Sequence, residues 1–286
     1  MSLRPVLAGS LRLLLTATLV AQANAQGLRS GKSTASTIPF ELVSDFVVVL
    51  RGQVGGLEGL RFILDTGSSH TMIDRRVADR LHLQRNPGRV LNFDRYIPVD
   101  WVDVPELRVG PIRTTAFRVM VVNLAELSAF GQKADGILGL DLLSRVTKLA
   151  IDYEKRVVCV EIEPQSKGGG PPPIGFVVPV AVQGVPMHLL VDTGFRDILM
   201  YKERLYSGLP HLRTKGEPQK ATIGRLQATR VNLPGIQIFG QDAVTPVFLI
   251  DGPKTGVGAV DGYLGPTSLH AKRIELDFAT KILFWQ

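Results

Sequence analysis

The sequence of 286 residues predicts an all-β protein built from two related lobes, and three observations support that prediction. The sequence repeats itself over most of its length. Runs of β-branched and aromatic residues alternate with turn residues, in a chain that holds 29 glycines and 18 prolines. A Gly- and Pro-rich segment, residues 166–173, falls between the two copies and is typical of an interdomain linker.

The internal repeat consists of three segments that recur in the same order at nearly the same distance. FILDTG at 62–67 recurs as LLVDTG at 189–194, so that the two Asp residues, at 65 and 192, are 127 positions apart. DGILG at 135–139 recurs as DGYLG at 261–265, and LAIDY at 149–153 recurs as IELDF at 274–278. The repeat predicts one lobe over 38–165 and a second over 174–286.

The elements within each lobe are mostly expected to be strands. Residues 46–50 and 176–182 are rich in β-branched side chains and open the two lobes, and in each a second apolar strand ends at the Asp. Residues 119–122 and 247–250 are expected to be later core strands. Short helices are expected within 74–83, 140–146 and 266–271.

The N-terminal segment predicts export. Arg4 and Arg12 flank a short apolar run, and Ala23-Asn24-Ala25 has the small-x-small form of a signal-peptidase site. The run is too short to span the hydrocarbon of a bilayer comfortably. We therefore expect residues 1–25 to be a signal peptide, with no stable membrane insertion after cleavage and a periplasmic or secreted location.

Composition argues against several other classes of function. The net charge of +7 is spread along the chain and no nucleic-acid reading motif accompanies it, so no nucleic-acid partner is expected. The five His residues show no ligand spacing, and a metal site or other cofactor is not expected. The single cysteine, Cys159, cannot form an internal disulfide and is expected to be a small buried apolar residue.

The two Asp-Thr-Gly segments are the candidate catalytic loops. Each Asp stands where an apolar strand breaks into a loop, the Thr hydroxyl can tie that loop to its neighbour, and Gly permits close backbone approach. Two carboxyls brought together by the repeat would share one proton. One could then act as a base toward water while the other polarises a carbonyl group. The residues predicted for the site are Asp65 and Asp192 as catalytic groups, and Thr66, Gly67, Ser68, Thr193 and Gly194 as support for the loops.

On these motifs the chain resembles the pepsin and retropepsin superfamily of aspartic peptidases, and most closely its bacterial retropepsin-like members. Each Asp-Thr-Gly is followed by an apolar-apolar-Gly motif, at 137–139 and 263–265, at nearly equal spacing. The resemblance implies two β-barrel lobes with a cleft between them, a peptide or protein substrate, and a monomer sufficient for the catalytic pair. It also implies hairpin flaps at about 89–101 and 219–230, with Tyr96 or Trp101 in contact with substrate.

The second loop departs from the family pattern at Phe195, where Ser, Thr or Ala is usual. We expect Ser68 to donate a hydroxyl hydrogen bond to Asp65, which Phe195 cannot do for Asp192. Arg196 adds a positive charge close to Asp192 if it points inward. The sequence therefore leaves three functions open: an aspartic endopeptidase, a weakened or inactive peptide-binding protein of the cell envelope, and an envelope scaffold protein without a peptide ligand.

Overall fold

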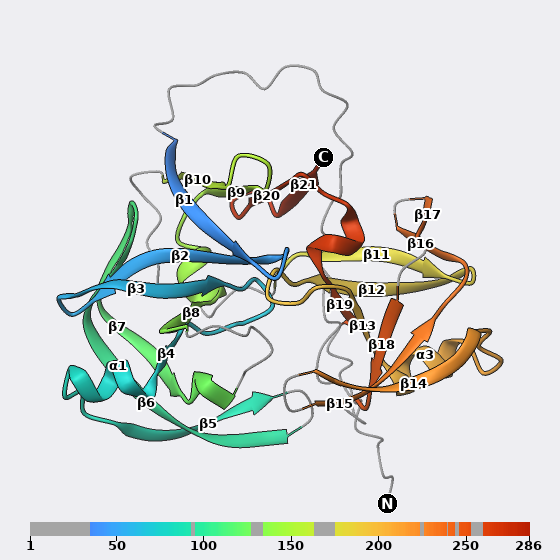
Figure 1. Ribbon diagram of the computed structural model, residues 1–286, viewed down its shortest axis with the longest axis horizontal. Helices are drawn as coiled ribbons and strands as arrows, with labels where there is room; N and C mark the ends of the chain where they lie inside the picture. The colour runs from blue at the N-terminus through green and yellow to red at the C-terminus, as the bar shows by residue number, and fades with distance from the viewer. Residues whose placement is uncertain are drawn as a thin grey trace, which may run out of the picture.

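The computed structural model describes residues 35–92, 95–126, 134–162, 175–223, 226–238, 240–243, 246–252 and 260–286. It confirms the all-β prediction: two lobes lie side by side, each built around a sheet (Figure 1). The predicted signal peptide (1–25) and the predicted linker (166–173) lie outside the described residues, so those two assignments and the exact lobe boundaries stay predictions.

The first lobe contains most of a 12-stranded sheet. Its elements are β1 (Ser36–Val43), β2 (Val47–Val54), β3 (Leu57–Leu64), β4 (Met72–Asp74), α1 (Arg75–Arg80), β5 (Asn86–Asn92), β6 (Arg95–Val109), β7 (Ile112–Val122), the 3-10 helix η1 (Leu124–Glu126), β8 (Gly136–Leu138), α2 (Leu140–Leu143), β9 (Lys148–Asp152) and β10 (Val157–Glu161).

The second lobe is built on a nine-stranded sheet. The elements of the second half are β11 (Val177–Val182), β12 (Val185–Val191), β13 (Ile198–Tyr201), α3 (Lys202–Gly208), β14 (Lys215–Ile223), β15 (Leu226–Asn232), β16 (Ile236–Ile238), β17 (Gln241–Ala243), β18 (Pro246–Ile250), β19 (Gly262–Leu264), the 3-10 helix η3 (Pro266–Leu269), β20 (Arg273–Asp277) and β21 (Ile282–Trp285). The helices α1, α2 and η3 begin inside the three predicted ranges and are shorter than predicted, whereas η1 and α3 lie outside those ranges.

The strand order of the two sheets repeats as the sequence does. Seven strands run β5-β6-β7-β4-β8-β3-β2 in the first lobe, and their counterparts run β14-β15-β18-β13-β19-β12-β11 in the second. In both lobes the hairpin that ends at the Asp, β2–β3 or β11–β12, has a two-residue turn with positive φ at both positions: Gly55-Gly56 (52° and 87°) and Gln183-Gly184 (50° and 83°). Such turns match the twist of the strands they join, so both copies direct the second strand of the hairpin toward its Asp.

A shared sheet joins the lobes, and the sequence did not indicate it. Strands β20 and β21, the last two of the chain, leave the second sheet and continue the first in the order β21-β20-β9-β10-β1. In Figure 1 strands β9, β10, β20 and β21 lie in the upper part of the molecule, above β2 and the near end of β11. Such pairing depends on contacts more than 100 residues apart, which local sequence patterns do not encode.

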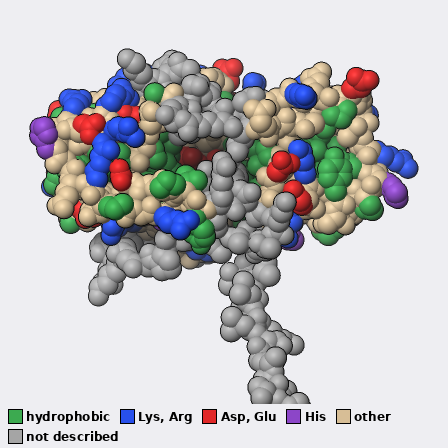
Figure 2. Space-filling model, turned by 90° about the horizontal axis from the view of Figure 1, so that it is seen from below, with side chains coloured by type: hydrophobic (Ala, Val, Ile, Leu, Met, Phe, Trp, Pro, Cys, Tyr) green, Lys and Arg blue, Asp and Glu red, His purple; other side chains and the backbone are tan. Residues whose placement is uncertain are grey.

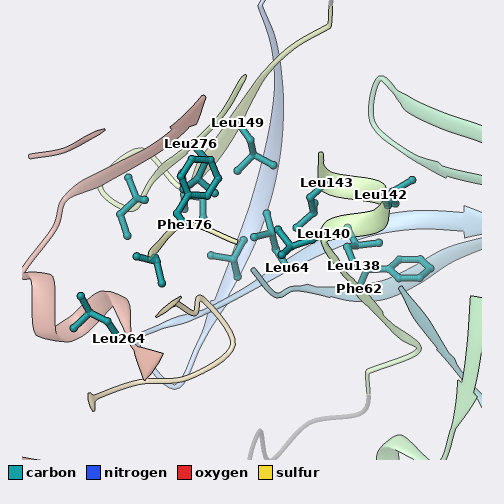
Figure 3. Packing of buried hydrophobic residues seen from close by; sticks show 14 of the residues in the cluster. Phe62, Leu64, Leu138, Leu140, Leu142, Leu143, Leu149, Phe176, Leu264 and Leu276 are labelled. Atoms are coloured by element: carbon teal, nitrogen blue, oxygen red, sulfur yellow. The ribbon is translucent and has the colours of Figure 1, made fainter. Parts of the chain in front are cut away.

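The apolar core is continuous from one lobe to the other. A single cluster of buried side chains includes Leu64 and Leu149 of the first half, and Phe176, Leu264 and Leu276 of the second (Figure 3). The core therefore fixes how the two lobes meet, which in turn fixes the relative position of the two Asp loops.

Cys159 corrects one prediction, because the thiol residue is partly exposed rather than buried. Its neighbours on β10, Val158 and Val160, have exposed fractions of 0% and 1%. Since successive side chains of a strand point to opposite faces, the position between these two valines must face outward.

The shared sheet predicts that removing apolar volume from β20 weakens the whole molecule. Leu276 is fully buried and pairs with Leu149 across the junction. We expect Leu276→Ala to lower the free energy of unfolding by about 2–5 kcal/mol, measured by urea denaturation. The matched control Ile162→Ala removes a side chain that is 42% exposed and should cost under about 0.5 kcal/mol. Equal losses in the two variants would contradict this role of β20.

Candidate active site

Each Asp loop is threaded by the Gly motif of its own lobe. β8 lies between β3 and β4, parallel to the first and antiparallel to the second, and β19 lies in the same way between β12 and β13. The backbone N–H of Asp65 donates to Leu138 O (3.1 Å), and that of Asp192 donates to Leu264 O (3.0 Å). The paired ladders hold both Asp residues at equivalent strand ends.

The glycine that closes each Gly motif permits this threading. A Cβ atom at Gly139 would lie 2.4 Å from the backbone carbon of His70, and one at Gly265 would lie 2.2 Å from the carbonyl oxygen of Arg196. Both contacts are too close for any side chain, so each motif needs glycine where it passes behind the Asp loop.

The two loops are locked together by crossed hydrogen bonds of their threonines. Thr66 Oγ1 donates to Val191 O (2.8 Å) and accepts from the N–H of Thr193 (3.1 Å). In the equivalent bonds of the other loop, Thr193 Oγ1 donates to Leu64 O (2.9 Å) and accepts from the N–H of Thr66 (3.1 Å). Both threonines are fully buried, so all four bonds form without competition from water.

The threonine lock brings the two carboxyls into contact. A side-chain hydrogen bond joins Asp65 and Asp192. A Cβ at Gly67 would lie 2.3 Å from the carboxyl carbon of Asp192, and a Cβ at Gly194 would lie 2.7 Å from that of Asp65. Each glycine therefore makes room for the acid of the opposite lobe. In Figure 2 the surface is hollowed between the lobes, with acidic side-chain atoms visible at the bottom of the hollow.

Both carboxyls accept backbone hydrogen bonds from their own loops. Asp65 accepts from the N–H groups of Gly67 (2.9 Å) and Ser68 (3.1 Å), and Asp192 accepts from the N–H of Gly194 (2.8 Å), which favours the charged form of each. Burial raises the pKa of both carboxyls, and the neighbouring Asp65 raises that of Asp192 further. The pair therefore titrates as a unit and shares one proton.

Ser68 is in the predicted loop, but the predicted hydrogen bond of its hydroxyl was wrong. The Ser68 hydroxyl donates to His70 O (2.8 Å), while its backbone N–H donates to Asp65. Phe195 offers its own backbone N–H to Asp192 in the same way. The loss of a hydroxyl at Phe195 therefore does not distinguish the two acids, because neither acid is bonded to a hydroxyl at that position.

Arg196 is not among the groups that shift the pKa of Asp65 or Asp192. The residue is exposed, and its charge acts on the neighbouring Asp197. Burial raises the pKa of Asp197, and the positive charge of Arg196 lowers it in part. The backbone O of Arg196 accepts a hydrogen bond from the Thr267 hydroxyl.

Hairpins are present at both predicted flap positions, formed by β5–β6 and β14–β15. In Figure 1 they extend toward each other along the lower side of the molecule. Tyr96 lies near the end of the first hairpin, 62% exposed, with the guanidinium of Arg89 over its ring at 5.5 Å. Trp101 lies farther back, partly exposed, with its ring edge-to-face with His70 at 5.1 Å. Only Trp101 therefore contacts an Asp loop, and substrate contact by either aromatic residue stays a prediction.

Asp141 is a supporting residue that the sequence reasoning missed. Its Oδ1 accepts from both the backbone N–H (2.8 Å) and the hydroxyl (2.6 Å) of Thr71, and the hydroxyl oxygen accepts from the N–H of Gly139 (3.1 Å). Asp141 thus ties the Asp loop to the Gly motif. Its position two residues after Gly139 was the available signal, but the second lobe has Thr267 there and the repeat did not reveal it.

The other residues considered in the sequence have structural roles or no common site. The acids of the third repeated segment are turn residues: Asp152 accepts from the N–H of Lys155, and Asp277 accepts from those of Ala279 and Thr280. Within the described part of the chain, no cluster of three His, Cys, Asp or Glu residues could hold a metal ion. The same residues include no helix long and apolar enough to cross a bilayer.

Part of the chain is similar to known proteins. Residues 50–142 match a family described as "Aspartyl protease". Among solved structures, the chain is similar to a retropepsin-like aspartic protease from Rickettsia conorii, at 16% sequence identity and a TM-score of 0.35, over 47% of this chain and 98% of that chain. Curated proteins gave no match.

The threonine lock predicts a large loss of stability when one hydroxyl is removed. Thr66→Val should leave Val191 O and the N–H of Thr193 buried without partners, at a cost of about 2–4 kcal/mol in the free energy of unfolding. Thr115→Val makes the same chemical change at an exposed strand position and should change stability by less than about 0.5 kcal/mol. Chemical denaturation of both variants provides the measurement, and a Thr66→Val protein as stable as Thr115→Val would refute the lock.

The raised pKa of Asp192 predicts a specific dependence of stability on pH. Between the ordinary Asp pKa of about 3.9 and the raised value, the folded protein holds a proton that the unfolded chain has lost, so this carboxyl lowers stability as pH rises. Asn cannot ionise. We expect the stability of Asp192→Asn relative to the wild type to increase steadily above pH 4, measured by urea denaturation at a series of pH values.

The control for this prediction is Asp251→Asn, because the Asp251 side chain is 80% exposed. Its stability difference from the wild type should stay small and nearly constant over the same pH range. A constant difference for Asp192→Asn as well would show that the Asp192 carboxyl has an ordinary pKa.

Proposed function

We propose that the chain is a retropepsin-like aspartic endopeptidase, which hydrolyses peptide bonds with a water molecule activated by Asp65 and Asp192. The observation that carries this proposal is the hydrogen bond between the two carboxyls, each seated against the glycine of the other lobe. Two carboxyls in direct contact cannot both ionise without a large electrostatic cost, so the resting pair holds one proton.

The reaction needs one ionised and one protonated carboxyl, and the pair supplies both. In the proposed assignment Asp65 is the ionised member and takes a proton from the attacking water. Asp192 is the protonated member and transfers its proton to the carbonyl oxygen of the scissile bond. The water oxygen adds to the carbonyl carbon at the same time, and a neutral tetrahedral diol forms.

Collapse of the diol completes the reaction. The proton taken up by Asp65 passes to the leaving amine nitrogen as the carbon–nitrogen bond breaks, and the second diol proton returns to the pair. The products are a carboxylic acid and an amine, and the pair again holds one proton. No group outside the two carboxyls is needed for these proton transfers.

The setting of the reaction is part of the same proposal. Both carboxyls come from one chain, so we propose that a monomer is sufficient for activity. The signal-like segment 1–25 supports export to the periplasm or the outside of the cell, where the substrate would be a peptide or an unfolded protein.

Substitution of either carboxyl tests the catalytic assignment. We expect Asp65→Asn and Asp192→Asn each to lower kcat/KM for a denatured protein substrate by at least about a thousandfold, because the loss of either acid removes the shared proton or the base. Asp251→Asn, an exposed acid, should retain wild-type activity. Cleavage products would be measured by mass spectrometry between pH 3 and 8.

Two outcomes would contradict the proposal in different ways. Equal activity of wild type and Asp65→Asn would remove Asp65 from the chemistry. Peptide binding without any cleavage by the wild type over this pH range would instead identify the protein as a non-catalytic peptide-binding member of the family.

A further inference from the structure

The alternation of side chains along β12 and β19 identifies what lies beside Asp192. Leu190 is two residues before Asp192, so both point to the same face of the sheet. Tyr263 of β19 is paired with Leu190 of the parallel strand β12 and with Leu199 of the antiparallel strand β13. Because paired residues of neighbouring strands point to the same face of a sheet, Tyr263 lies on that face too. Leu264, the next residue, is fully buried in the main core on the opposite face.

An aromatic cluster occupies this face of the second lobe. The rings of Tyr263 and Tyr201 are 6.1 Å apart, and their hydroxyls are hydrogen-bonded at 3.2 Å. Phe195, from the Asp loop itself, packs edge-to-face on Phe248 at 6.1 Å. Tyr201 is buried, whereas the other three residues are partly exposed. The buried tyrosine holds Tyr263 in place while leaving apolar ring surface open.

The β14–β15 hairpin contributes small side chains to this cluster. Ala221 of β14 and Ala228 of β15 are paired and contact the same group of residues as Tyr263 and Phe195. Tyr263 and Phe195 remain partly exposed beside these methyl groups. Burial raises the pKa of Tyr263, and Tyr201 raises it further. The charges of Asp192 and Asp65 raise it as well, which agrees with a position of Tyr263 close to the carboxyl pair.

The matching positions of the first lobe are closed. Ile137 is the counterpart of Tyr263, and Ile63 is its strand neighbour, with exposed fractions of 4% and 2%. Both are covered by residues of their own lobe, among them Phe46 and Leu124. Where the second Asp loop has a phenylalanine, the first has the small polar Ser68. At the positions that match Leu190 and Tyr263, the first lobe therefore offers no open apolar surface.

We propose that Phe195 and Tyr263 are specificity-determining residues that make substrate recognition one-sided. The subsite beside Asp192 binds an aromatic or large aliphatic side chain of the substrate, and the matching subsite beside Asp65 does not select for one. This inference rests on the proposed function, because it takes the hollow between the lobes as the peptide-binding cleft.

The test measures binding separately from cleavage. Peptides of about eight residues carry one reduced, non-hydrolysable amide bond and differ only in having Phe or Ala on one or the other side of it. For the wild type, Phe on one side should tighten Kd about tenfold relative to Ala, and Phe on the other side less than about threefold. Isothermal titration calorimetry gives each Kd.

The variants copy residues of the first lobe into the second. Tyr263→Ile and Phe195→Ser should each reduce the tenfold preference to below about threefold. Tyr263→Phe keeps the ring and should retain the preference, and Tyr206→Ile, which removes an exposed ring on α3, should behave as wild type. Circular dichroism establishes that each variant is folded, and the two independent substitutions protect the test against the failure of either one to fold.

The outcomes separate this inference from the proposed function. Equal Phe preference on both sides, a preference that survives in both variants, or no peptide binding by folded wild type would overturn the one-sided subsite. A one-sided preference in a wild type that never cleaves the corresponding ordinary peptides would support the subsite and overturn the catalytic proposal. Cleavage with a specificity that neither variant changes would support the catalytic proposal and overturn the one-sided subsite.

Discussion

The structure depends on one constraint: two buried threonines must each reach the backbone of the opposite lobe. Thr66 and Thr193 can do so only if the strands before them end at the same level and the lobes meet along a fixed line. The continuous core and the shared sheet at the top of the molecule provide that line. Once the threonines are engaged, the adjacent carboxyls have no position except beside each other, and only glycine at 67 and 194 leaves room for them.

The symmetry of this frame includes the backbone around the two carboxyls but not the side chains beside them. Asp65 and Asp192 both accept backbone N–H groups of their own loops, and burial raises the pKa of each. The side chains differ, since the second lobe places Phe195 and Tyr263 where the first has Ser68 and an isoleucine. The repeated scaffold thus supplies equivalent positions for the two acids, and the residues next to them give the two sides different surfaces.

Much of the fold and the central pair could be predicted because they follow from repeated local patterns. The Asp-Thr-Gly and Gly motifs recur at matching spacing, and glycine at their ends is needed for close packing. The partner of the Ser68 hydroxyl could not be predicted, because the position of His70 O depends on the folded loop. The pairing of β20 with β9 could not be predicted for a related reason, because neither strand's own sequence determines which distant strand it pairs with or in what register. The exposure of Cys159 was predictable by alternation along its strand.

The central claim is that two carboxyls from different lobes hold one proton jointly, and the titration of those carboxyls measures this most directly. In protein labelled with ¹³C at the Asp carboxyl carbons, NMR should show one resonance titrating well above the ordinary Asp range, together with a second that responds to the same step. In Asp65→Asn the high titration should move downward, since the charge that raises it is gone. Two independent titrations near pH 4, unaffected by that substitution, would contradict the account.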